Sequence, residues 1–101
     1  MTLLVPEDEP CYVISVAAEM IRVHPRTLRH YEALGLVCPA RVSGKRMYSP
    51  SDIEKLRKIS RLTDDLGVNL AGVEVILRLT QQVESLQMEI EQIKREFGKH
   101  L

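Results

Sequence analysis

The apolar positions in the N-terminal third of the chain have the spacing of two short amphipathic helices joined by a tight turn. The first helix is expected over 16–22, with Ser15 as its N-cap. For the second, His24 stands where an N-cap belongs, and Pro25 takes the first helical position, where a missing N–H costs nothing. Gly35 supplies the left-handed stop. This order of elements is typical of a helix-turn-helix.

The second helix carries apolar and polar residues on different sides. Leu28, Tyr31 and Leu34 recur at three-residue spacing, so they are expected to face the domain. The polar side consists of Arg26, Thr27, Arg29 and His30. Such a helix is suited to enter the major groove of DNA as a recognition helix. Taken alone, the stretch also fits an ordinary surface helix with solvated charges.

A small basic hairpin is expected over 41–48, directly after the second helix. Ser43 and Gly44 suit a two-residue turn, because glycine tolerates positive φ. Arg41, Lys45 and Arg46 cluster around the tip and would repel one another without an anionic partner. A hairpin in this place is typical of a wing that contacts phosphates or a minor groove. A solvated hairpin is the less favoured alternative.

A third helix is expected to begin at Ser49-Pro50-Ser51-Asp52, where a cap, a first-turn proline and a capping-box acid follow one another. Gly67 ends it, and Asn69 caps the next helix. The stripe of the third helix that should be buried comprises Ile53, Leu56, Ile59, Leu62 and Leu66.

Beyond residue 73, no glycine or proline interrupts the chain until Gly98. Apolar residues there alternate three- and four-residue steps, which is the 3.5-residue seam of a coiled coil. Glutamine and charged residues leave the seam too narrow for a monomeric core helix. The seam predicts a dimerisation helix, with the contacts made by Leu79, Val83, Leu86, Ile90, Ile93 and Phe97. The pattern itself leaves the orientation of the two helices open.

Together these elements predict a mainly α protein, in which a winged helix-turn-helix DNA-binding head precedes a coiled-coil dimerisation helix. Residues 1–11 are expected to form a flexible acidic arm, 12–78 the DNA-binding domain and 79–101 the dimerisation helix.

Charge is distributed in a way that the net value of zero conceals. Residues 11–62 contain ten Lys and Arg against four Asp and Glu, whereas the segments on either side are acidic. A local excess of cations is the electrostatic signature of a domain that binds a polyanion. Two identical heads in a symmetric dimer would bind a palindromic duplex.

Other classes of function find little support in the sequence. Cys11 and Cys38 lie far apart in the chain without neighbouring ligands, so we expect no metal site and no cofactor. No paired carboxylates, nucleophile–base set or phosphate loop suggests an enzyme. No apolar run of about 18 residues is present, so we expect no membrane contact and a cytoplasmic protein. An adaptor that binds a protein or modulates a chaperone through the same head, without DNA, remains the alternative.

Several motifs resemble those of the MerR family of bacterial transcription regulators. They are the run from Arg26 to Val37, then Arg46-Met47-Tyr48-Ser49 with Asp52, and Leu66-Gly67. The resemblance covers roughly 12–78. It implies an antiparallel coiled-coil dimer and palindromic operators that are bent when bound. It also implies DNA contacts at Arg26, Thr27, Arg29, His30, Tyr31, Lys45, Arg46 and Tyr48. His30 departs from the tyrosine commonly found at its position.

Two further segments, 12–18 and 67–73, are similar to the heat-shock repressor (HspR) subgroup of that family. This similarity implies a repressor of heat-shock and chaperone genes, with the DnaK chaperone as protein co-repressor. Family sensors carry cysteines around the dimerisation helix, and this chain has none after Cys38. We therefore expect regulation by a protein partner or by temperature and no small-molecule effector.

Overall fold

The computed structural model describes residues 5–99. The chain forms two compact units, Met1–Gly67, here called the head, and Val68–Leu101. The boundary expected from the sequence lies later, after residue 78. No break occurs at that point, because one helix, α4, extends across it.

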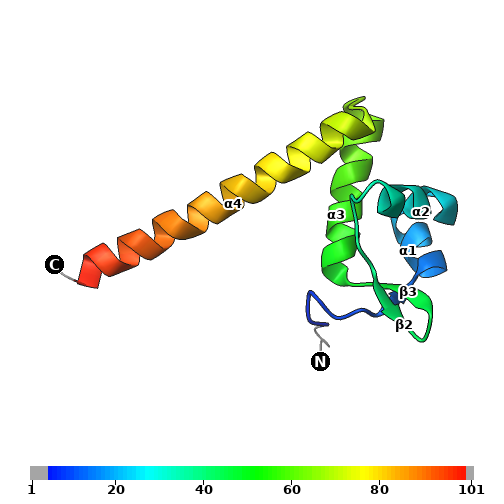
Figure 1. The fold of residues 1–101 in the computed structure, drawn as a ribbon, viewed down its shortest axis with the longest axis horizontal. Coiled ribbons are helices and arrows are strands. Elements are labelled where there is room, and N and C mark those ends of the chain that lie inside the picture. Colours follow the sequence, from blue (N-terminus) through cyan, green and yellow to red (C-terminus); the bar gives the residue numbers. More distant parts are fainter. Residues whose placement is uncertain (1–4, 100–101) are drawn as a thin grey trace. The chain divides into compact units, whose positions relative to one another are not determined.

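The head alternates short helices with a small sheet (Figure 1). Its elements in chain order are β1 (Tyr12–Val13), α1 (Ile14–Ile21), α2 (Pro25–Ala33), β2 (Ala40–Val42), β3 (Lys45–Tyr48), α3 (Pro50–Ser60) and the π-helical turn η1 (Arg61–Asp65). The described elements confirm a mainly α fold with a helix-turn-helix followed by a hairpin.

The first helix begins earlier than the sequence predicts. Val13 occupies the N-cap position without a side-chain hydrogen bond, so the expected cap, Ser15, lies inside α1. The reason is tertiary: Tyr12 and Val13 pair with β3, and the chain passes directly from this strand into the helix. Arg22 ends α1 in the left-handed region at φ 59° and starts the turn toward α2.

The three strands form an antiparallel sheet in the order β1-β3-β2. Ser43 and Gly44 connect β2 to β3 with φ of 51° and 78°. Positive φ at both central residues is the geometry of a type I′ hairpin turn, which confirms the predicted turn. β3 is the central strand, and β1 pairs with it on the side opposite to β2.

The core of the head is formed by buried side chains from its three α-helices, from the sheet and from the segment between α2 and β2. It comprises Ala17, Ala18, Leu28, Tyr31, Leu36, Val37, Tyr48, Ile53, Leu56 and Ile59. The capping box of Ser49 and Asp52 is present and starts α3 as predicted. The predicted stripe of this helix is wrong at its end, because Leu66 is 71% exposed. At η1 the backbone bond from Leu66 N–H to Arg61 O spans five residues, which rotates Leu66 away from the stripe.

Within the described residues, the N-terminal segment forms backbone hydrogen bonds with the rest of the head. The Ser51 N–H donates to the Glu7 carbonyl at 2.8 Å, and the Cys11 N–H donates to the Tyr48 carbonyl at 3.1 Å. These bonds differ from the expectation of a flexible arm for 5–11. Residues 1–4 lie outside the described residues.

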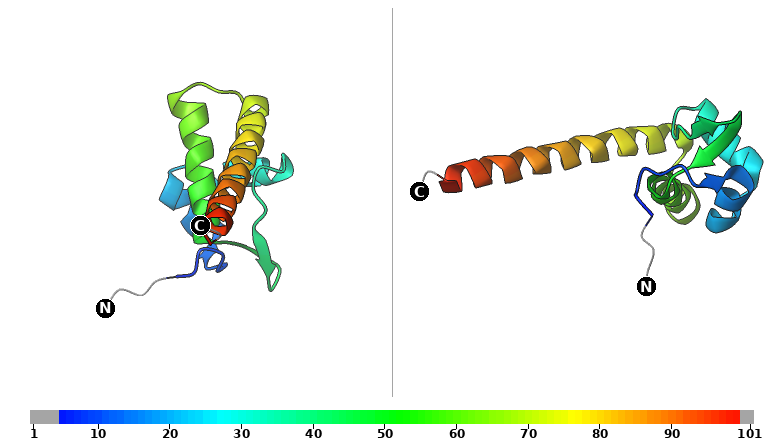
Figure 2. Two further views of the ribbon diagram at one scale, coloured as in Figure 1. Left: turned by 90° about the vertical axis from the view of Figure 1, so that its left-hand side faces the viewer. Right: turned by 90° about the horizontal axis from the view of Figure 1, so that it is seen from below.

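The second unit is built on α4, which spans Leu70–Lys99 and is one uninterrupted helix (Figure 2). The Asn69 side chain caps it by accepting from the Gly72 N–H at 2.8 Å, as predicted. Val73 and Leu77 are buried, whereas every side chain from 81 to 99 is exposed. Within 5–99, no helix has the length and apolarity needed to cross a membrane.

Candidate nucleic-acid interface

The predicted recognition helix α2 presents cations to solvent and apolar residues to the core. Arg26, Arg29 and His30 are exposed, and Thr27 is half-buried. Leu28 is fully buried on the opposite side. The helix therefore has the polar side that contact with DNA requires.

The N-terminus of α2 is fixed by its cap. Nδ1 of His24 accepts a hydrogen bond from the Arg26 N–H at 3.0 Å, and Pro25 follows at the first helical position. Since recognition helices contact base edges with their N-terminal residues, this cap orders the part of α2 where Arg26 lies.

Replacing His24 by Ala is expected to lower the free energy of unfolding by about 1 kcal/mol, because the cap hydrogen bond is lost. The His24→Asn variant should stay close to the parent, since asparagine also accepts at an N-cap. Denaturant unfolding at one protein concentration measures both. Equal losses in the two variants would contradict a capping role.

The hairpin is attached to α2 through one carboxylate. Nε of Arg46 lies 2.7 Å from Oε1 of Glu32, and Nη2 of Arg41 lies 3.4 Å from Oε2 of the same side chain. Arg41 precedes the turn and Arg46 follows it, so Glu32 holds both strands of the wing against the recognition helix. Among the ion pairs formed within 5–99, none involves Lys45, which leaves its ammonium available at the tip.

Glu32 is the positioning residue that the sequence analysis did not identify. The sequence contains a sign of this role: Glu32 is the one acidic residue between the start of α2 and the end of the hairpin, where all other charged residues are cationic. The predicted repulsion among Arg41, Lys45 and Arg46 is relieved within the chain for two of them. The wing therefore does not need a polyanion in order to form.

The two tyrosines predicted as DNA contacts belong to the core. Tyr31 is 7% exposed and Tyr48 is 0% exposed. Burial raises the pKa of both phenols, and the charge of Glu32 adds to the increase at Tyr48. The Tyr48 hydroxyl is enclosed and has no hydrogen-bond partner among the described residues. Its position differs from the DNA contact that the family resemblance implies for Tyr48.

The Tyr48→Phe variant is expected to unfold at higher denaturant concentration, with a gain of about 1 kcal/mol, because a buried hydroxyl without a partner carries a desolvation cost. Affinity for DNA should not change. A loss of DNA affinity at unchanged stability would show instead that the hydroxyl contacts DNA.

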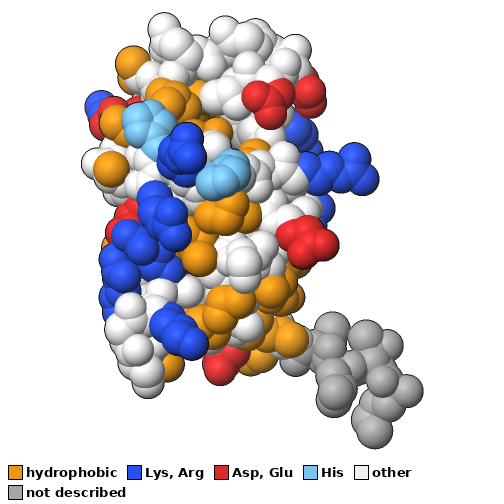
Figure 3. All heavy atoms as spheres, turned by 90° about the vertical axis from the view of Figure 1, so that its right-hand side faces the viewer, with side chains coloured by type: hydrophobic (Ala, Val, Ile, Leu, Met, Phe, Trp, Pro, Cys, Tyr) orange, Lys and Arg blue, Asp and Glu red, His pale blue; other side chains and the backbone are white. Residues whose placement is uncertain are grey.

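The remaining candidates form a cationic surface. In the view onto α1 and α2, Lys and Arg side chains gather along one edge, and histidine side chains flank a further Lys or Arg side chain (Figure 3). Because Glu32 is paired with two arginines, its charge is compensated on this surface. The arrangement suits an extended polyanion.

The predicted dimerisation residues lie on α4 and are exposed. Leu79, Val83, Leu86, Ile90, Ile93 and Phe97 have exposed fractions between 50% and 66%. A row of exposed apolar side chains this long costs free energy in water, which makes it a candidate association surface.

No metal centre is found on the part of the chain that the structure describes. Within 5–99, no three His, Cys, Asp or Glu side chains are grouped so that they could hold an ion. Cys11 and Cys38 are exposed free thiols.

Comparison with known proteins agrees with this geometry. The family described as "MerR HTH family regulatory protein" matches residues 12–80. The chain is 54% identical over 82 residues to a putative heat shock protein HspR of Streptomyces coelicolor, which covers 80% of this chain. It is 33% identical over 84 residues to the transcriptional regulator GlnR of Bacillus anthracis, which covers 81% of it. The chain spans 54% and 64% of the lengths of these two relatives.

The fold is also similar to that of a solved structure. This is HiNmlR, a MerR family regulator lacking the sensor domain, bound to promoter DNA. The TM-score is 0.60 at 22% sequence identity, and the match covers 85% of this chain and 77% of the other. The family match and the 54% identity to HspR confirm the resemblance to HspR-like regulators that the motifs indicate. The chain belongs to the MerR family of helix-turn-helix regulatory proteins.

Proposed function

We propose that this protein is a dimeric, sequence-specific DNA-binding repressor of heat-shock and chaperone genes. The observation that supports this most strongly is the linkage of two cationic elements: a capped α2 whose exposed side carries Arg26 and Arg29, and a wing held to it by Glu32. A fixed separation between recognition helix and wing lets one head contact a base edge and the neighbouring backbone together.

Each proposed contact follows from the chemistry of the exposed side chains. Arg26 and Arg29 can each donate two hydrogen bonds to O6 and N7 of a guanine. Thr27 can contact a thymine methyl, and His30 a base or phosphate. Lys45 at the wing tip is proposed to contact a phosphate, which supplies affinity rather than sequence preference. Arg46 is proposed to position the wing through Glu32.

Dimerisation is proposed through the seam of α4. With 30 residues at 1.5 Å each, α4 is about 45 Å long. Two such helices paired in antiparallel orientation would place their N-terminal ends far apart. That separation is of the same order as the 34–36 Å between half-sites that lie one DNA turn apart. It therefore agrees with the antiparallel dimer that is expected for the family.

The stress-response role rests on the similarity to HspR, and the chain matches about half of that relative. We expect a cytoplasmic protein whose operator affinity is changed by a protein partner, with the DnaK chaperone as the expected co-repressor. Titrating purified DnaK into a complex of the protein with its operator tests this. Unchanged operator affinity at saturating chaperone would rule DnaK out.

The function itself is tested by selecting bound duplexes from genomic DNA and measuring affinity at several salt concentrations. We expect an enriched palindrome that binds at least a hundredfold more tightly than its scrambled sequence, since specific sites usually exceed non-specific DNA by 10³ or more. Equal affinity for both duplexes would refute the proposal.

A further inference from the structure

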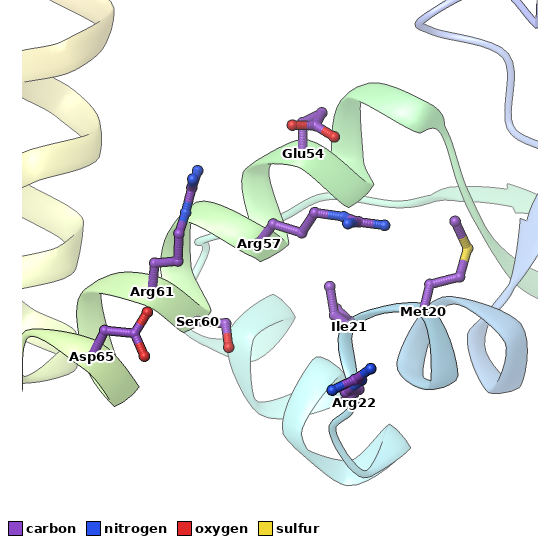
Figure 4. Close-up of a pocket in the computed structure, with 8 residues that line it drawn as sticks. All are labelled: Met20, Ile21, Arg22, Glu54, Arg57, Ser60, Arg61 and Asp65. Atoms are coloured by element: carbon purple, nitrogen blue, oxygen red, sulfur yellow. The ribbon is translucent and has the colours of Figure 1, made fainter.

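The head contains a second candidate surface, which shares no residue with the proposed DNA contacts. An open groove of about 710 Å³ runs between the end of α1 and the side of α3 and η1 (Figure 4). From α1 it is lined by Met20, Ile21 and Arg22. From α3 and η1 come the arginines 57 and 61.

The arginines of this groove form no ion pair with an acidic side chain among residues 5–99. None of the ion pairs or side-chain hydrogen bonds found within 5–99 involves Arg22, Arg57 or Arg61. The side chain of Arg57 extends across the groove toward Met20 (Figure 4). A guanidinium offers five N–H donors in a planar fork that matches a carboxylate, so these side chains are available to bind one.

The groove also offers apolar contact. Met20 is 36% exposed, and Val16, one helical turn earlier on α1, is 43% exposed. Residues four apart lie on the same side of a helix, so the two form an apolar strip that ends at the arginines. Methionine adapts to side chains of different shapes and is common on surfaces that bind peptides.

Two carboxylates distinguish this groove from the DNA-binding surface. Glu54 and Asp65 also line it, and neither takes part in an ion pair within the described residues. A nucleic-acid backbone carries a negative charge at every phosphate and would be repelled by both. A peptide can place its carboxylates at the arginines and its N–H donors at Glu54 and Asp65. The mixed lining therefore favours a polypeptide.

We propose that the groove binds a segment of a partner protein in which Asp or Glu side chains alternate with large apolar ones. The carboxylates pair with Arg57 and Arg61, and the apolar side chains pack on Met20 and Ile21. This surface goes beyond operator binding and does not depend on it, because none of its residues is a proposed DNA contact.

The probe is a fluorescein-labelled peptide of alternating leucine and glutamate, titrated by fluorescence anisotropy. The titrations use the full chain carrying Arg26→Ala and Arg29→Ala, so that the peptide cannot bind the cationic side of α2. Adding Arg57→Glu and Arg61→Glu is expected to weaken binding at least tenfold. Adding Lys58→Glu, a charge reversal on α3 that does not line the groove, should change it less than twofold. Thermal unfolding confirms that each variant is folded.

A peptide with lysine in place of glutamate should bind the Arg57→Glu, Arg61→Glu variant more tightly than the chain with both arginines intact. Equal peptide affinity in the groove variant and the Lys58→Glu control would overturn the proposal. The two groove substitutions are also introduced into the chain with Arg26 and Arg29 intact. A loss of operator affinity there, with peptide binding unaffected, would likewise overturn it and assign the groove to DNA phosphates.

Discussion

Replacing Arg26 and Arg29 together by alanine is expected to weaken operator binding by at least about thirtyfold. The two side chains are exposed on the polar side of α2, and a bidentate contact with guanine contributes about 1–3 kcal/mol of discrimination. Affinity for scrambled DNA should fall much less, so the ratio between specific and non-specific binding should collapse. Anisotropy titrations of both duplexes measure this ratio.

Two comparison variants make the result specific. Arg78→Ala removes an exposed arginine of α4 and should leave both affinities unchanged. Lys45→Ala at the wing tip should weaken binding to all duplexes by a similar factor. It should also lower the slope of log affinity against log salt concentration by about one. If the Arg26, Arg29 variant keeps its preference for the operator, base contact by these two side chains is excluded. The adaptor alternative would instead be favoured if the unaltered chain bound the operator and scrambled DNA equally weakly.

Introducing aspartate at Leu86 is expected to convert the proposed dimer into a monomer and to reduce operator affinity at least a hundredfold. Leu86 lies near the middle of the seam and is 57% exposed in the single chain. Dimerisation would bury this residue against the second helix, where an unpaired carboxylate has a high desolvation cost. Sedimentation equilibrium at micromolar concentration measures the loss of the dimer, and a titration with the palindrome measures its consequence.

Met88 offers the matched control, because it is two residues away, 72% exposed and outside the seam. The Met88→Asp variant should remain dimeric and bind the operator normally. Affinity for a single half-site should be the same in both variants, since the head is unaltered. If the Leu86→Asp variant is still a dimer, the association surface must lie elsewhere on the chain.

Local signals in the sequence predicted most of the secondary structure. The cap at His24, the capping box at Ser49 and the hairpin turn at Ser43 each depend on residues within four positions of one another, and all three are present. The two errors have different causes. The start of α1 depends on the pairing of β1 with β3, which are distant in the chain. The exposure of Leu66 follows from the local π-helical turn over 61–65, which the spacing of apolar residues did not indicate.

The candidate site shows the same division. Sequence spacing placed Arg26 and Arg29 on the exposed side of α2, as the structure has them. It could not show that Tyr48 is enclosed, because a tyrosine in an alternating strand suits either side of the sheet. Nor could it show that Glu32 binds both arginines of the wing, since that contact joins a helix to two strands.

The proposed function requires that two heads, joined through α4, bind one duplex together. Inserting about five base pairs between the half-sites of the selected palindrome turns them to opposite faces of the duplex. We expect the affinity for this duplex to fall to that for one half-site. Undiminished affinity would mean that the two heads do not bind as one rigid dimer, and would contradict the account.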